Sequence, residues 1–155
     1  MDKNRTIIPP GKQEIIFEWY FDARRERVFK IYTDPSLVSQ WWGFSDSTTD
    51  VEEMQVRPGG KWRIISKDAD GNSYGFHGVY HEVLPNERLV YTFEYDGTPG
   101  HVLLETITFS EENGLTKVLD QSVYQSVEDR EGMVEEGMEE GANETFERIV
   151  ELLEL

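Results

Sequence analysis

The last thirty residues of the chain, from Ser126 to Leu155, carry the pattern that most constrains its fold. Apolar side chains recur there every three or four positions, the spacing of one face of an α-helix: Val134, Met138, Ala142, Phe146, Ile149 and Leu153. Ser126 and Asp129 have the spacing of a capping box, which predicts where the helix begins. Such a helix would be about 40 Å long. Because a helix this charged is stable only when its apolar face is packed, a broad apolar surface is expected beneath it.

The preceding sequence predicts strands that supply this surface. Between residues 13 and 21, Ile15, Phe17, Trp19 and Phe21 fall at alternate positions, as in a half-buried strand. Asp22 is the expected cap of a helix reaching Thr33, and Asp34-Pro35 begins a second short helix. Six further strands are expected, separated by turn sequences, at 50–56, 60–67, 73–83, 88–95, 102–110 and 115–124. This order indicates an α+β fold, an antiparallel sheet curled around one terminal helix.

Length and composition predict one domain without membrane or nucleic-acid partners. The chain has 155 residues, of which 37% are hydrophobic, and we expect a loose leader over residues 1–12 before a single domain over 13–155. Lys and Arg total 15 against 31 Asp and Glu, so the formal charge is -16, which disfavours nucleic acid and anionic membranes. The chain has no cysteine, no apolar run near membrane-span length and no signal-peptide core. We therefore expect a cytoplasmic protein, either a monomer or a weak homodimer.

The composition of the terminal helix predicts a cavity. Its first half has the small residues Gly132, Gly137, Gly141 and Ala142, whereas its second half has large side chains such as Phe146. Small side chains do not fill the gap between a helix and a curled sheet. We expect a tapered cavity, open near the helix start, unless bulky aromatic side chains of the sheet fill the gap.

An ordered series of motifs resembles one known family. The matching stretches are Phe21-Asp22-Ala23, Tyr32-Thr33-Asp34-Pro35, Trp41-Trp42-Gly43, Arg57-Pro58-Gly59-Gly60-Lys61-Trp62-Arg63, Gly78-Val79-Tyr80-His81-Glu82-Val83, Glu87-Arg88-Leu89-Val90-Tyr91-Thr92, Ser122-Val123-Tyr124 and Gly137-Met138-Glu139-Glu140-Gly141. Together they resemble the activator-of-heat-shock-protein-90-ATPase-like family of the START-like, birch-pollen-allergen superfamily. The resemblance implies a helix-grip fold, in which a curved sheet of seven strands surrounds a long C-terminal helix, with two short helices. It also implies a protein that binds a hydrophobic small molecule, more than an enzyme for one particular reaction. Many relatives have a tryptophan where this chain has Ala142, which should enlarge the cavity.

Two acidic residues of the last hairpin form the most specific chemical feature. An Asn113-Gly114 turn places Phe109 opposite Val118, so that Glu105 and Asp120 lie diagonally on the apolar face, at about 7–8 Å. Two carboxyl groups beside an apolar cavity should have at least one raised pKa and could anchor a ligand or act as acid and base. Two alternatives remain open: this end of the sheet opens to water, or an arginine such as Arg63 pairs with one of the carboxylates.

These residues define a candidate site and three functional hypotheses. The expected ligand-binding residues are Trp41, Trp62, Phe93, Tyr95, Glu105, Asp120, Tyr124, Met138 and Ala142, although for most aromatics a plain core role is the alternative. The first hypothesis is binding of an apolar or aromatic small molecule. The second is an enzyme of the cyclase or hydratase kind that uses Glu105, Asp120 and Tyr124, and the third is a co-chaperone-like interaction module. The spacing of His77, His81 and His101 favours no metal site, and no cofactor motif is present.

Overall fold

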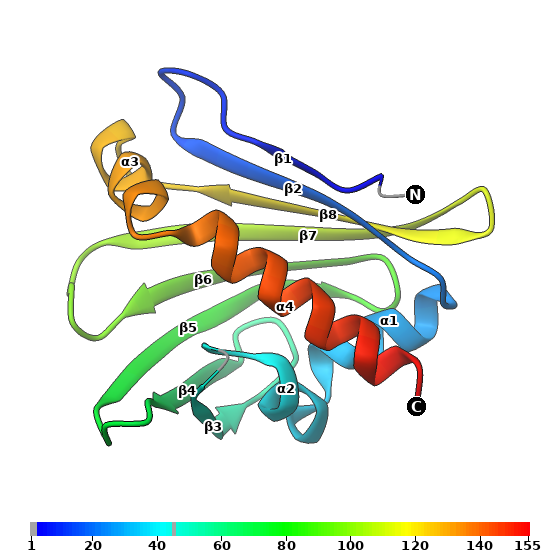
Figure 1. The fold of residues 1–155 in the computed structure, drawn as a ribbon, viewed down its shortest axis with the longest axis horizontal. Helices are drawn as coiled ribbons and strands as arrows, with labels where there is room; N and C mark the ends of the chain where they lie inside the picture. The colour runs from blue at the N-terminus through cyan, green and yellow to red at the C-terminus, as the bar shows by residue number, and fades with distance from the viewer. Residues whose placement is uncertain (1–2, 45) are drawn as a thin grey trace.

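The computed structural model describes residues 3–44 and 46–155, which form one antiparallel sheet with four helices. The sheet has eight strands in the order β1-β2-β8-β7-β6-β5-β4-β3. Figure 1 shows α4 crossing one face of the sheet, with α1 near its C-terminal end. This arrangement confirms the α+β helix-grip fold. The elements are β1 (Arg5–Ile7), β2 (Glu14–Phe21), α1 (Arg25–Thr33), α2 (Pro35–Trp41), β3 (Thr48–Met54), β4 (Lys61–Lys67), β5 (Ser73–Leu84), β6 (Arg88–Tyr95), β7 (Val102–Glu112), β8 (Leu115–Val123), α3 (Val127–Glu135) and α4 (Met138–Leu153).

The C-terminal helical segment is divided in two, so the prediction of one continuous helix is wrong. It begins as expected, because the Ser126 hydroxyl accepts a hydrogen bond of 3.0 Å from the Asp129 amide. It is interrupted at Gly137, whose φ of 84° is left-handed, and the Gly137 amide bonds to the Val134 carbonyl at 3.1 Å. A left-handed glycine with this bond is a common helix end. The predicted apolar stripe nevertheless packs against the core, and Ile149 and Leu153 on it are buried.

Part of the segment before residue 13 pairs with the sheet. Strand β1 pairs with β2, with Arg5 opposite Glu18 and Ile7 opposite Ile16, so the sheet has one strand more than expected. Nη1 of the buried Arg130 side chain donates a 2.7 Å hydrogen bond to the Pro9 carbonyl. This bond connects the segment before β2 to α3 at the other end of the chain.

The two short helices differ in how they begin. Asp34 caps α2 as expected, accepting a 2.9 Å hydrogen bond from the Ser36 amide ahead of a proline in the first turn. Asp22 does not cap α1, which contradicts the prediction. That helix begins after Arg24, and no side chain caps it.

The core lies between the sheet and α4. All four apolar residues expected to face inward from β2 are buried. Two of them contact the helix, because the Phe146 ring stacks on Phe21 at 4.9 Å and meets Trp19 edge-on at 5.5 Å. The second half of α4 is therefore packed against β2, as its large side chains predict.

Candidate ligand cavity

The β7–β8 hairpin brings Glu105 and Asp120 together. Its turn has the positive φ values of a tight hairpin, 53° at Asn113 and 80° at Gly114. The register is the predicted one, with Phe109 opposite Val118, Ile107 opposite Asp120, and Glu105 opposite Ser122. Because alternate residues of a strand share a face, both carboxyl groups lie among buried apolar side chains such as Ile107 and Phe109.

Burial dominates the electrostatics of this carboxyl pair. It raises the pKa of Glu105 well above its ordinary value, and the neighbouring Asp120 carboxyl raises it further. Burial also raises the pKa of Asp120, although its hydrogen bond with Glu105 acts in the opposite direction. The Ser122 hydroxyl donates to Glu105 Oε1 at 2.6 Å. Two hydrogen-bonded carboxyl groups titrate together, and because burial raises the pKa of both, the pair keeps its protons to a higher pH than exposed acids would.

The arginine alternative for this pair is not observed, because the Arg63 guanidinium pairs with Asp96 at 2.6 Å and with Glu52 at 3.3 Å. As whole residues Glu105 and Asp120 are half-buried, and the Oδ1 atom of Asp120 is fully buried. Among residues 3–44 and 46–155, no lysine, arginine or histidine forms an ion pair with Glu105 or Asp120. The buried Oδ1 of Asp120 has no hydrogen-bond partner in the described part of the chain.

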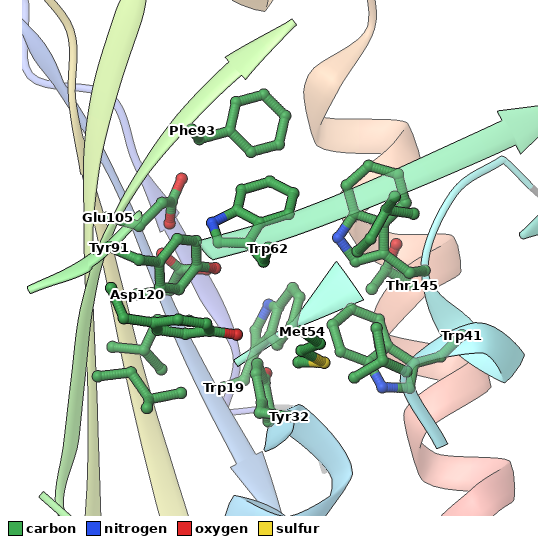
Figure 2. A pocket seen from close by; sticks show the side chains of 16 residues that line it. Trp19, Tyr32, Trp41, Met54, Trp62, Tyr91, Phe93, Glu105, Asp120 and Thr145 are labelled. Carbon is green, nitrogen blue, oxygen red and sulfur yellow. The ribbon is translucent and has the colours of Figure 1, made fainter. Parts of the chain in front are cut away.

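The pair lies in the wall of a cavity of about 190 Å³, here called the inner cavity. Figure 2 shows Glu105 and Asp120 beside Tyr91 on the sheet side, with Thr145 and Trp41 on the opposite side. Strands β2 and β4 to β8 contribute to the wall, together with β3, α1, α2 and α4. The lining residues are Trp19, Tyr32, Val38, Trp41, Trp42, Met54, Trp62, Ile64, Tyr80, Leu89, Tyr91, Phe93, Glu105, Ile107, Asp120 and Thr145.

Two tyrosines complete the polar surface of the inner cavity. Burial raises the pKa of the Tyr32 hydroxyl well above its usual value, with further increases from Asp120 and then Glu105. Tyr91 behaves in the same way, since burial raises its pKa first and the two carboxyl groups follow. The buried Tyr32 hydroxyl has no hydrogen-bond partner in the described part of the chain. It is therefore a polar group that a bound molecule could satisfy.

The structure separates the predicted site residues into three groups. Trp41, Trp62 and Phe93 line the inner cavity with the carboxyl pair. Tyr95 and Tyr124 instead line a second hollow of about 290 Å³, here called the outer cleft, in which Phe93 also takes part. Burial raises the pKa of Tyr124.

Met138 and Ala142 line neither the inner cavity nor the outer cleft. Both pack against the core instead. The glycines of this segment differ in their surroundings: Gly132 lines the outer cleft, Gly137 breaks the helix, and Gly141 is exposed with open space around it.

The contribution of α4 to the inner cavity is Thr145, which the sequence prediction missed. Its position was available as a signal, because residue 145 lies three positions after Ala142 and seven after Met138, on the same helical stripe. Trp19 and Tyr32 were also missed as wall residues. Nothing in their spacing distinguishes a cavity wall from solid core.

The outer cleft lies between the β6–β7 connection and α3. Asp129, in the first turn of α3, is 3.0 Å from Nδ1 of His101, and this hydrogen bond raises the pKa of His101. The remaining lining residues include Glu128, Gly132, Met133 and Glu136. The cleft therefore has an apolar floor and an acidic margin.

The described residues contain no cluster of three or more His, Asp or Glu side chains arranged to hold a metal ion. None of the helices in residues 3–44 and 46–155 has the length and hydropathy needed to cross a membrane.

Comparison with known structures supports the fold. A solution structure of a protein from Arthrobacter aurescens superimposes with a TM-score of 0.89 at 23% identity, over 97% of this chain and 91% of that one. The crystal structure of protein Ms6760 from Mycobacterium smegmatis gives 0.87 at 22% identity, over 96% and 95% of the two chains. A protein from Rhodobacter sphaeroides gives 0.87 at 21% identity, over 96% and 97%. No curated protein sequence matches significantly.

The family assignment comes from the sequence itself. A family model described as "Activator of Hsp90 ATPase homolog 1-like protein" matches residues 22–154, which is most of the chain. The matched range runs from the residue after β2 to the end of α4 and includes nearly all of the inner cavity wall. Fold and family together indicate a ligand-binding or co-chaperone-like domain. The chain therefore belongs to the activator of Hsp90 ATPase homolog 1-like family.

Proposed function

We propose that the protein binds a small, largely apolar or aromatic molecule in the inner cavity, with Glu105 and Asp120 as polar anchors. The observation that carries this proposal is a buried carboxyl pair in the wall of an aromatic cavity. A buried polar atom that lacks a hydrogen-bond partner costs free energy, and a bound molecule would supply partners to this pair. The size also suits a small guest, since an apolar cavity of about 150 Å³ accommodates benzene.

The test is to fill the inner cavity from its helix side. Native mass spectrometry of freshly purified protein should show a bound small molecule, and Thr145→Trp should abolish this additional mass, because Thr145 is the part of α4 that lines the cavity. Glu140→Trp is the matched control, because Glu140 is on the same helix but exposed. Equal retention of the molecule by both variants would refute binding in the inner cavity.

An enzyme of the cyclase or hydratase kind is a second candidate, favoured by the hydrogen bond within the carboxyl pair. A hydrogen-bonded carboxyl pair with raised pKa values can both donate and accept a proton, as acid–base catalysis requires. Tyr124 opens to the outer cleft, so this mechanism relies on the carboxyl pair alone. An enzyme would convert the captured molecule with a bell-shaped pH profile, and Glu105→Gln would lose turnover while retaining binding. A pH-independent conversion would exclude it.

A co-chaperone-like interaction is the third candidate, favoured by the exposed acidic side chains of α3 and α4. Glu131, Glu135, Glu139 and Glu140 are all exposed. Such a surface suits a basic partner. In that case Glu139→Gln with Glu140→Gln would weaken the complex, and Thr145→Trp would leave it intact.

A further inference from the structure

The inner cavity is built from an unusual share of aromatic side chains. The chain has four tryptophans, and all of them, Trp19, Trp41, Trp42 and Trp62, line this one cavity. Tyr32, Tyr80, Tyr91 and Phe93 bring the aromatic members to half of the 16 lining residues. A guest that needs only an apolar surface is served equally well by aliphatic side chains. Aromatic faces in addition carry a negative potential, which attracts cations.

Hydrogen bonds to the backbone hold two of these indoles in place. Trp62 Nε1 donates to the Thr92 carbonyl at 3.1 Å, and Trp41 Nε1 donates to the Ile31 carbonyl at 2.9 Å. Gly78 makes room for the first of these rings, because a Cβ there would lie 2.6 Å from Trp62 Nε1. The indole donors are thus already satisfied within the protein. What the two rings offer a guest is their π surface.

The carboxyl pair differs from other acids of the described chain that have cationic partners. Glu18 pairs with Arg5 and Lys117, and Asp96 pairs with Arg63. The pair's electrostatic neighbours are instead the hydroxyl groups of Tyr32, Tyr91 and Tyr124. A buried carboxylate normally acquires a cationic partner or becomes protonated. Here the open space beside the carboxylate is cavity, and its opposite wall is aromatic.

Extending the proposed binding function, we infer that the inner cavity takes a small organic cation of the alkylammonium class, with its substituents against the aromatic walls and its charge beside Glu105 and Asp120. Aromatic surfaces combined with a carboxylate recognise ammonium groups through both cation–π and ionic attraction. Both contributions are strong in a site that excludes water. The inference narrows the class of ligand that the proposed function leaves open. If the cavity binds neutral molecules equally well, the inference fails while the proposed function stands.

Two pairs of shape-matched probes test the inference on the wild-type protein. Choline is compared with 3,3-dimethyl-1-butanol, which has carbon in place of nitrogen, and cyclohexylammonium with cyclohexanol. Titration calorimetry gives the affinities, and tryptophan fluorescence reports occupancy because all four tryptophans line the cavity. We expect each cation to bind at least tenfold more tightly than its neutral counterpart.

Equal affinities would overturn the cation inference and leave the proposed small-molecule binding standing. Absence of binding by both cations at millimolar concentration would also overturn it.

Matched variants distinguish the effect of the carboxyl pair on cation binding from the effect of the overall charge of the protein. Glu105→Gln combined with Asp120→Asn removes the pair's charge at nearly constant volume, and the cation preference should fall to about one. Glu139→Gln combined with Glu140→Gln removes at least as much formal negative charge from exposed positions and should preserve the preference. An equal loss in both double variants would assign the effect to bulk charge and contradict the inference.

A third measurement does not depend on any variant folding. A bound cation favours the ionised carboxyl pair, so binding should release protons, whereas binding of the neutral counterpart should not. The other titratable groups facing the pair are Tyr32, Tyr91 and Tyr124, whose raised pKa values keep them protonated throughout. Calorimetry in two buffers of different ionisation enthalpy measures the protons released. Zero release with both cations would count against ionic contact with the pair.

Discussion

At the scale of single residues, the Glu105–Asp120 pair is the most consequential feature of the molecule. The Asn113–Gly114 turn fixes the strand register, and the register places both carboxyl groups in the same cavity wall. Burial then raises both pKa values. The folded protein therefore retains protons that the unfolded chain would release.

This difference makes the stability of the protein depend on pH in a predictable direction. For a carboxyl group with a raised pKa, the stabilisation is complete below the unfolded-state pKa, about 4, and is lost as pH rises toward the folded-state pKa. We expect Glu105→Gln with Asp120→Asn to gain stability relative to wild type as pH rises above about 4, by up to about 1.4 kcal/mol per pH unit for each proton. Urea unfolding between pH 4.5 and 8 measures the difference.

Acids with lowered pKa values, such as Asp34, Asp68 and Asp96, contribute a pH dependence of the opposite sign. These acids are present in the wild type and in the double variant, so their contributions cancel when the two stabilities are compared. Parallel stability curves for the two proteins would show that the pair does not titrate differently on folding.

At the scale of elements, the break between α3 and α4 determines where the C-terminal helical segment faces the sheet. Gly137 has a φ of 84°, which residues with a Cβ rarely adopt, whereas Gly141 lies inside α4. Both are exposed, and a Cβ at either would meet open space. The two glycines therefore differ in backbone conformation and not in packing.

Alanine substitution at these two glycines should have opposite effects. Gly137→Ala should destabilise the protein by about 1–2 kcal/mol, because alanine is strained in the left-handed conformation. Gly141→Ala should stabilise it by about 0.5–1 kcal/mol, because glycine is unfavourable inside a helix. Denaturant unfolding of both variants gives the values. If both substitutions stabilised the protein, the break at Gly137 would be absent in solution and the helix continuous.

At the scale of the whole molecule, the formal charge of -16 works against compactness. The acids are concentrated in the C-terminal third, where α3 and α4 carry exposed glutamates along their solvent side. Arginine partners are found for some acids on the sheet, such as Glu82 with Arg88. Self-repulsion of this kind is long-ranged and is reduced by salt.

Raising the salt concentration should therefore stabilise the protein. The screening length falls from about 30 Å at 0.01 M to about 3 Å at 1 M. A gain of about 1 kcal/mol would raise Tm by about 2–4 °C for a chain of this size. Calorimetric melting in NaCl measures the rise, which should be smaller for the variant Glu139→Gln with Glu140→Gln. A Tm that falls with salt would mean that attractive ion pairs outweigh the repulsion.

The amino-acid sequence by itself determined most of the strands, the short helices and the register of the last hairpin. Periodicity identified β2 and the apolar stripe of the C-terminal segment, and the turn residues at 113–114 placed Glu105 and Asp120 on the inner face. These features depend on local geometry, which neighbouring residues encode. Only the tertiary structure decided which part of the helical segment lies over the cavity, because that depends on the break at Gly137 and on how Phe146 packs against β2. As a result Thr145, rather than Met138 or Ala142, lines the inner cavity.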